Sequence, residues 1–446
     1  MGLLLGVLLL FATPARAGLL ADRLELKMYG RVGLAWTHTG DLILGQRLNL
    51  TGGPLGGRLE EGDYLEPTLI LNLIEPPPKE EDARQAQVTP FVRLVMTPAL
   101  LSRESLFIGT FSSQFAETLR IELFQAYIEA GNFLLPGLRL WGGARFYRGT
   151  DVHIADYYFF NNLTGQGVGL QYGSLDLAVL LHSAKSGPLY NVDVDGDGEP
   201  DVRRQRTVLA GQYVFALPAR NTLQVLTELH LLPTARLRLP ERTPVQPADH
   251  GWVVGLKARF VLPNEGFNDI SIRYGRGLAN GGFAGAQTWN TFGLTNLEGR
   301  HDGAAGVEVV DHLLLNLNPH VGFNAYGIFH HARGASGTPE DEALDFAVGA
   351  RTTLYLADVF HLIQESSYQG LLKGTDPFAT AVKLTLMPTF VPTGERDVWA
   401  RPHLRVFYTL ALYDRHAVAL LASPYLRTVG ATSLGHYVGA QVEWWF

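Results

Sequence analysis

Segments of roughly ten residues, in which apolar and polar side chains alternate, recur along most of this 446-residue chain. In WVVGLKARFVL (252–262), one face carries only apolar side chains, while the other carries Lys257 and Arg259. Successive side chains of a β-strand point to opposite faces, so each segment predicts a strand with one apolar and one polar face. The same pattern occurs at 26–36, 223–231, 344–356 and 402–412.

Two architectures are compatible with such strands: a transmembrane β-barrel, whose outer face meets lipid, and a soluble β-sandwich. Three observations favour the barrel. The polar faces carry glycine and charges of both signs, aromatic residues occur near strand ends, and no linker divides the chain into domains. We therefore predict an all-β fold, a transmembrane antiparallel β-barrel, with room for about 16 to 18 strands.

The segments between the predicted strands have two lengths. Short segments rich in proline, glycine and asparagine at 135–139, 216–222 and 317–320 predict tight turns, which would face the periplasm. Longer irregular segments predict extracellular loops at 38–58, 148–166, 184–204, 275–304, 331–342 and 423–436.

The chain begins with an apolar run (3–11) that is too short to span a bilayer. Ala15, Arg16 and Ala17 follow it and match the small-x-small pattern of a signal-peptide cleavage site, although no lysine or arginine precedes the run. We predict a signal peptide over residues 1–17 and a barrel domain over residues 18–446. The expected location is the bacterial outer membrane, with its lipid around the barrel.

Charge and motif content exclude several classes of function. The net charge of −7 gives no basic surface for nucleic acid, so we expect no nucleic-acid partner. The nucleophile motif G-x-S-x-G does not occur, and the His-Asp-Gly triplet at 301–303 has no serine at a recognisable spacing. We therefore expect a protein that is not an enzyme and that requires no cofactor.

The chain ends in GAQVEWWF, where two adjacent tryptophans must face opposite sides of a strand. Trp444 and Phe446 share the apolar face, which would meet lipid where aromatic residues anchor barrels. Trp445 shares the other face with Glu443 and Gln441, so it is expected to face the lumen.

Several stretches resemble one family in collinear order. LWGGARFYRGTDVHIADYYFFNNLTGQGVGLQ (140–171), DVWARPHLRVFYTLALYD (397–414), MYGRVGLAW (28–36), NEGFND (264–269) and the terminal GAQVEWWF are similar to segments of the maltoporins, the sugar-porin family. The resemblance implies an 18-stranded, homotrimeric barrel whose third extracellular loop folds inward and constricts the channel. It also implies that sugars pass along a row of lumen aromatic residues, the aromatic slide, flanked by charged residues.

The resemblance assigns roles to individual residues. The expected aromatic slide consists of Tyr29, Tyr64, Phe115, Tyr158, Phe267, Trp399 and Trp445. The expected charged residues, which would hydrogen-bond sugar hydroxyl groups, are Arg31, Arg58, Glu66, Arg148, Asp151 and Asp156. For Arg58, a solvated loop residue is the alternative. Strand alternation independently places Tyr29 and Arg31 on the lumen face, and it would place Trp399 on one face with Arg401 and Arg405.

The chain departs from the family at the constriction. Phe124 and Gly149 stand where the family has arginines. The tryptophan that loop 2 contributes to a neighbouring channel has no clear equivalent, and Phe115 and Phe111 are the candidates for its role. These changes leave the preference for maltodextrins open.

Two acidic clusters have the residue types of metal sites. Asp193, Asp195, Asp197 and Asp201 have calcium-loop spacing, although Arg204 stands where an EF-hand has its bidentate glutamate. Calcium binding there and a solvated acidic turn are both open. Asp151, His153 and Asp156 could also hold a metal, but the resemblance assigns the two aspartates to sugar contacts.

These observations together predict a passive outer-membrane sugar porin that takes maltodextrins or similar oligosaccharides. The alternative is a general diffusion porin of related topology without sugar specificity. The expected charges of both signs in the lumen speak against a filter of a single sign.

Overall fold

The computed structural model describes residues 23–36, 48–50, 55–74, 89–102, 119–182, 191–192, 202–236, 245–281 and 290–446. Within these ranges, eighteen strands form one antiparallel sheet. They are β1 (Leu24–Trp36), β2 (Tyr64–Asn72), β3 (Phe91–Ser102), β4 (Leu119–Gly131), β5 (Leu138–Arg145), β8 (Gly165–Tyr172), β9 (Leu175–His182), β12 (Arg206–Ala216), β13 (Thr222–Leu232), β16 (Asp249–Val261), β17 (Phe267–Gly277), β18 (Ala305–Asn318), β19 (Val321–Arg333), β20 (Glu342–Tyr355), β21 (Phe360–Lys373), β22 (Ala379–Phe390), β23 (His403–Tyr413) and β24 (Leu434–Trp445).

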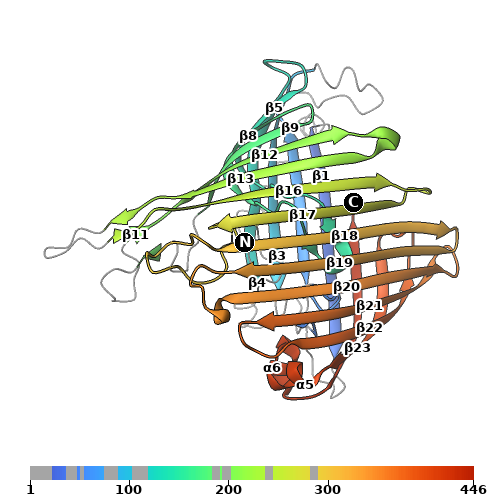
Figure 1. Ribbon diagram of the computed structural model, residues 1–446. Helices are drawn as coiled ribbons and strands as arrows, with labels where there is room; N and C mark the ends of the chain where they lie inside the picture. Colours follow the sequence, from blue (N-terminus) through green and yellow to red (C-terminus); the bar gives the residue numbers. More distant parts are fainter. Residues whose placement is uncertain are drawn as a thin grey trace.

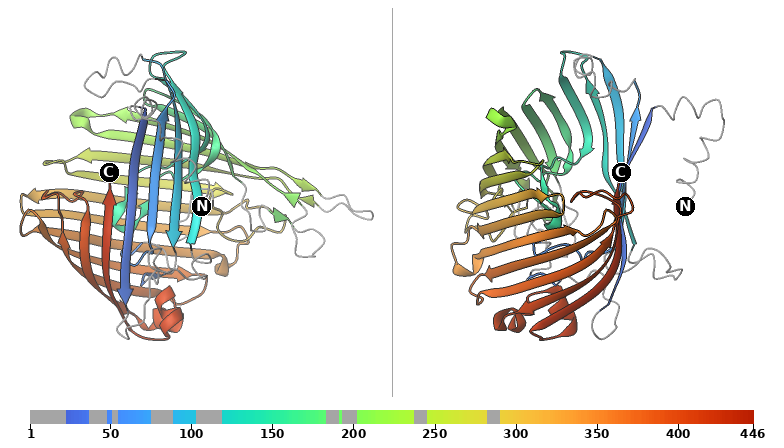
Figure 2. Two further views of the ribbon diagram at one scale, coloured as in Figure 1. Left: turned by 180° about the vertical axis from the view of Figure 1, so that it is seen from behind. Right: turned by 90° about the vertical axis from the view of Figure 1, so that its right-hand side faces the viewer.

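The sheet closes on itself. Each strand pairs with the next one in the chain, and β24 returns to pair with β1, with Trp445 opposite Tyr29. Figure 2 shows the red last strand beside the blue first strand. The near and far walls cross in Figure 1, as expected for strands that tilt against a barrel axis. The predicted antiparallel barrel of eighteen strands is confirmed.

The two faces of the wall follow the alternation in the sequence. On β16, the side chains of Val254 and Leu256 are 46% and 49% exposed on the outer face, while the adjacent Val253 is 1% exposed on the inner face. Closure leaves no edge strand with unpaired backbone groups, which is the condition for a sheet to cross lipid. Among the described residues, no helix is long and apolar enough to cross a membrane.

Short pieces of secondary structure lie outside the barrel wall. Two short helices lie in the connection between β23 and β24. The first, α5 (Arg415–Ala419), stands just before the predicted loop 423–436, and the second, α6 (Pro424–Val429), lies within it. Asp414 and Ser423 cap them by accepting hydrogen bonds from the backbone N–H groups of Ala417 and Leu426. The paired strands β10 (Asn191–Val192) with β11 (Val202–Arg203), and β14 (Ala235–Arg236) with β15 (Val245–Gln246), extend from the long-loop end.

Loop 3 (residues 146–164), between β5 and β8, folds into the barrel as predicted. Its strands β6 (Asp151–Val152) and β7 (Tyr157–Tyr158) form a small hairpin. Apolar side chains of this loop pack on the inner wall of β13, β18, β19 and β20; the cluster comprises Leu55, Val152, Ile154, Ala155, Tyr157, Phe159, Phe160, Leu226, Val310, Tyr326, Ile328 and Ala347. Glu308 on β18 adds polar anchors, accepting from the Tyr157 hydroxyl and, at 3.3 Å, from the Phe160 backbone N–H.

Loop 1 (residues 48–50 and 55–63), which precedes β2, also enters the barrel. The sequence predicted an extracellular loop over 38–58 and assigned only Arg58 of that segment to the channel; residues 48–50 and 55–57 also lie buried in the lumen. Lys383 on β22 holds the loop, with its Nζ 2.9 Å from Glu60 Oε1 and 2.8 Å from Asn49 Oδ1. The prediction missed this fold because the contacts of loop 1 with β19, β21 and β22 join residues 271 to 334 positions apart in the sequence.

Candidate functional site

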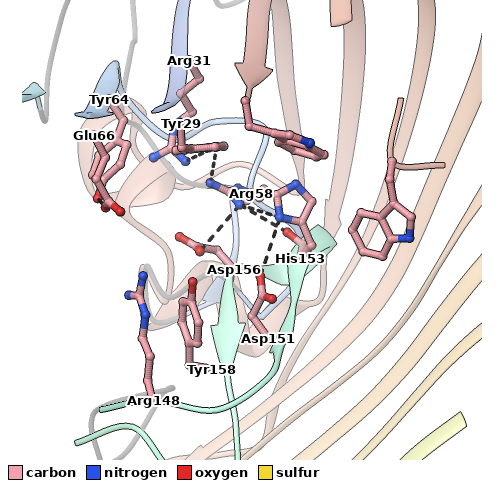
Figure 3. A pocket seen from close by; sticks show the side chains of 12 residues that line it. Tyr29, Arg31, Arg58, Tyr64, Glu66, Arg148, Asp151, His153, Asp156 and Tyr158 are labelled. Carbon is pink, nitrogen blue, oxygen red and sulfur yellow. Dashed lines mark hydrogen bonds and ion pairs between the residues drawn. The ribbon is translucent and has the colours of Figure 1, made fainter. Parts of the chain in front are cut away.

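A cavity of about 520 Å³ remains in the lumen beside β1, β2 and β24 (Figure 3). It is bounded on the other side by loop 3 and by the turn before β23. The residues that line it are Tyr29, Arg31, Arg58, Tyr64, Glu66, Arg148, Asp151, His153, Asp156, Tyr158, Trp399 and Trp445. Eleven of these twelve are residues that the sequence assigned to the aromatic slide or to its charged flanks; His153 is the addition.

The aromatic side chains form a continuous row from the extracellular end of β2 toward the periplasmic end of the barrel. The ring of Tyr64 lies 5.7 Å from that of Tyr29, and Tyr29 is stacked at 6.4 Å on Trp445. His153 continues the row, with ring centroids 5.3 Å from Trp445 and 6.0 Å from Trp399. Strand pairing sets these neighbours, because Tyr29 stands opposite both Glu66 on β2 and Trp445 on β24.

Trp399 reaches the cavity from an unexpected element. The sequence placed it on a strand with Arg401 and Arg405, but β23 begins only at His403, and Trp399 belongs to the preceding turn. Its backbone N–H donates to Asp397 Oδ1 at 2.6 Å, and its side chain is 39% exposed. The strand assignment of Trp399 is therefore wrong, while its position at the lumen cavity agrees with the prediction.

Arg58 stands at the centre of the polar groups (Figure 3). Its guanidinium donates to the Tyr29 hydroxyl at 2.8 Å and lies 3.6 Å from Asp156 Oδ1. The Tyr29 hydroxyl in turn donates to Glu443 at 3.0 Å. Glu443 is held by Arg401 and Arg405 at 3.1 and 3.2 Å. This chain of contacts fixes the ring of Tyr29 at the cavity.

The loop 3 carboxylates stay ionised because cations surround them. Burial by itself would raise the pKa of Asp156, but the guanidinium groups of Arg58 and Arg31 outweigh burial and hold this pKa below its usual value. Burial would likewise raise the pKa of Asp151, but the hydrogen bond from His153 and the nearby positive charge, including that of Arg58, together lower it. Ionised carboxylates accept hydrogen bonds from hydroxyl groups, which suits them to polyhydroxylated ligands.

Arg58 also bears on the metal alternative for Asp151, His153 and Asp156. Its guanidinium lies 3.3 Å from Nδ1 of His153 and 3.6 Å from Asp156. A metal ion bound between these side chains would stand beside a fixed positive charge. The arrangement therefore favours hydrogen bonding by the two aspartates over coordination of a cation.

Three predicted sites lie elsewhere or outside the described residues. Phe267 faces the lumen from β17 but is 8% exposed, packs against His312 and Arg259, and does not line the cavity. Phe115 and the four aspartates of the predicted calcium loop, Asp193, Asp195, Asp197 and Asp201, are outside the described residues, as is the predicted signal peptide. In the sequence, His153 was considered only as a possible metal ligand. Its position between Asp151 and Asp156, both assigned to sugar contacts, was the signal that could have placed it at the cavity.

The cavity thus offers flat ring faces on one side and donors and acceptors of both charges on the other. Such a surface can stack the apolar face of a ring-shaped ligand and hydrogen-bond the groups on its rim. Because each contact is weak and many are similar, a ligand can move from one to the next.

Solved structures to which the chain is similar include three outer-membrane proteins. These are OprD of Pseudomonas aeruginosa (8% identity, 95% of this chain and 95% of that chain, TM-score 0.42), the channel DcaP of Acinetobacter baumannii (11%, 95% and 98%, 0.41) and OmpT of Vibrio cholerae (10%, 95% and 100%, 0.39). The model of the LamB porin family matches residues 24–446, which is nearly the whole chain. The protein is therefore an outer-membrane channel that belongs to the LamB porin family.

Proposed function

We propose that this porin is a sugar channel that lets maltodextrins or similar oligosaccharides diffuse passively across the outer membrane. The observation that carries the proposal is the row of rings from Tyr64 through Tyr29 and Trp445 to Trp399, with charged groups beside it in one lumen cavity. A pyranose has apolar C–H faces and a polar rim, and the two sides of the cavity match them.

The balance of charge supports an uncharged solute. Three arginines and three carboxylates line the cavity, and they are Arg31, Arg58 and Arg148 with Glu66, Asp151 and Asp156. A filter for anions or for cations would carry charged side chains of a single sign around the channel. Mixed signs instead provide donors and acceptors to hydroxyl groups without a net field that selects ions.

Transport assays distinguish the sugar channel from a general diffusion porin. Liposomes containing the purified protein should swell faster in maltodextrins than in amino acids or sucrose relative to solute size. Added maltodextrin should also block single-channel current in a saturable way. Equal size-corrected rates for all solutes, together with no saturable block, would refute sugar specificity and favour the general porin.

Two tryptophans test the aromatic row directly. Trp399→Ala should raise the half-blocking concentration of maltodextrin by about threefold or more, because an aromatic stacking contact contributes about 0.5–1.5 kcal/mol. Trp252 is a matched control, since its side chain is 38% exposed, close to the 39% of Trp399, but faces outward from β16. Trp252→Ala should leave the block unchanged. Equal effects of both variants would contradict the slide assignment.

Two further parts of the proposal concern assembly and calcium. We propose that the channel is a homotrimer, which native mass measurement in detergent would test. We also propose calcium binding by the loop that contains Asp193, Asp195, Asp197 and Asp201, which lies outside the described residues. Calcium titration of the purified protein, compared with an Asp195→Asn variant, would show whether that loop binds the ion.

A further inference from the structure

A β-bulge in β4 turns an additional aromatic side chain into the lumen. Gln125 pairs with Thr97 and Leu123 with Pro98, so Phe124 is an extra residue without a partner on β3. Gln125 faces the lumen, where its amide donates to the Thr97 hydroxyl and accepts from the backbone N–H of Phe146. Leu123 is 60% exposed on the outer face. Bulges re-aim side chains, and this one lets two successive residues, Phe124 and Gln125, face inward.

Phe124 and Phe146 extend the aromatic row beyond the cavity. The ring of Phe124 is stacked against Tyr64 at 6.5 Å with an interplanar angle of 22°. Phe146, at the start of loop 3, lies 5.6 Å from Phe124. Both side chains are partly exposed, and neither lines the main cavity. The rings of Tyr64, Phe124 and Phe146 therefore form an apolar surface, the Phe124–Phe146 shelf, which adjoins the cavity at Tyr64.

The shelf lies on the extracellular side of the cavity. Tyr64 is the first residue of β2 and Phe146 follows the last residue of β5, and both of these strand ends carry long loops. The opposite end of the row, at Trp399, lies in a turn on the short-turn side of the barrel. A ligand that enters from outside therefore meets the shelf before the cavity.

Arg148 marks the junction between shelf and cavity. Its guanidinium carbon lies 3.9 Å from the ring centres of both Phe146 and Tyr158, so the side chain is held between two rings. Among the described residues, no ion pair joins Arg148 to a carboxylate. Its N–H groups are therefore available to a ligand at the point where the apolar shelf meets the polar cavity.

We propose that the Phe124–Phe146 shelf is a subsite for an apolar group attached to a sugar, such as an aryl group on the anomeric oxygen. This inference rests on the proposed sugar channel and names the ligand class that the channel prefers. An unsubstituted pyranose on the shelf would leave part of its hydroxyl rim beside rings rather than polar partners, which is unfavourable. An aryl group gains ring contacts there, while its sugar occupies the cavity and Arg148 hydrogen-bonds the oxygen between them.

The test compares two ligands that share a sugar, maltose and 4-nitrophenyl α-maltoside, in single-channel recordings of the full-length protein. In the native channel, the aryl glycoside should block at a concentration at least about threefold lower than maltose, as expected for one aromatic contact. Phe124→Ala should bring the two half-blocking concentrations together by weakening aryl glycoside block. Phe260→Ala, which removes an outward-facing phenylalanine that is 42% exposed, should leave the ratio as in the native channel.

A second variant, Phe124→Leu, and a third ligand, 4-nitrophenol, distinguish the remaining outcomes of this test. Phe124→Leu keeps apolar volume at the bulge and should give an intermediate ratio, which also tests the subsite if Phe124→Ala does not assemble. Equal block by both ligands in the native channel would overturn the subsite but leave the proposed sugar channel standing. Block by neither ligand would overturn both. Comparable block by 4-nitrophenol alone would also overturn the subsite, because the sugar would then play no part.

Discussion

Loop 1 and loop 3 both enter the barrel, but loop 1 makes more polar contacts with its wall. Loop 3 inserts apolar side chains such as Ile154 and Phe160 between residues of β13, β18, β19 and β20. Loop 1 also buries Leu48, Leu50 and Leu59 in an apolar cluster with residues of β21 to β24. It adds several polar contacts: the hydroxyls of Tyr326 and Ser367 donate to its backbone carbonyl groups at 2.6 and 2.9 Å, and Lys383 pairs with Glu60.

The difference shows that polar lumen residues have two distinct roles. On the wall from β19 to β23, polar side chains hold loop 1 and are buried beneath it. On the wall formed by β24, β1 and β2, similar residues face the open cavity. A charged residue on the lumen face is therefore not by itself a ligand contact; its role depends on whether a loop covers it.

The largest effect is expected from Phe160→Ala, which removes a large part of the apolar contact between loop 3 and the barrel wall. The Phe160 side chain is fully buried, and removing such a ring costs about 3–5 kcal/mol. Loop 3 should leave the wall, so single-channel conductance should rise and sugar block should weaken. The control Phe215→Ala, on the outer face, should change neither. Unchanged conductance with Phe160→Ala would show that polar anchors alone hold loop 3.

Lys383→Met tests the polar attachment of loop 1 and is expected to have the next largest effect. It leaves the carboxylate of Glu60 buried without its cation, a loss of about 3 kcal/mol. Conductance should rise as loop 1 is released, and adding Glu60→Gln should restore part of the native value. Lys373→Met, at the exposed end of β21, is the control. A native conductance in Lys383→Met would remove the distinction between the two loops.

Gly255→Val tests the packing of Phe160 from the side of the barrel wall, because Gly255 lies on β16 against the Phe160 ring. Its expected effect is smaller. A Cβ atom at Gly255 would lie 2.7 Å from the Phe160 ring, so the ring must shift at a cost of about 1–3 kcal/mol. The variant should show flickering current as loop 3 detaches briefly. Gly327→Val is the matched control, because nothing lies within 4 Å of a Cβ there. Identical recordings for both variants would contradict the proposed packing.

The smallest effect is expected from Asp156→Asn, measured as a function of pH. The pKa of Asp156 is lower in the folded protein than in the unfolded chain, so its ion pairs contribute stability above about pH 4 and lose it as the pH falls further. The variant should weaken maltodextrin block about twofold, by the same factor at about pH 7 and about pH 5. A factor that falls to one at the lower pH would mean that Asp156 titrates there.

Much of the fold could be predicted because side-chain alternation is a local property of each strand. The inward face of Tyr29 and the outward face of Trp252 both follow from their own segments. The inward position of loop 3 came from resemblance. Loop 1 escaped prediction because Glu60 meets Lys383 across 323 residues of sequence. The bulge at Phe124 was equally hidden, since one extra residue changes pairing without changing composition.

The site could be predicted residue by residue only as far as the resemblance extended. It named Tyr64 and Asp156, which both line the cavity. It also named Phe267, which faces the lumen but packs against Arg259 away from that cavity. Strand alternation assigns Phe267 and Tyr29 to the same inner face and cannot separate them, because it contains no information on where around the barrel a strand stands.

By itself, the sequence determined the strands and which face of each meets lipid, because these depend on a two-residue period within a single segment. The tertiary structure alone decided which lumen residues meet the cavity and which lie beneath loops. That choice depends on barrel closure, which brings Trp445 beside Tyr29, and on contacts of loops 1 and 3 with distant strands. Such contacts join residues hundreds of positions apart, so no local pattern encodes them.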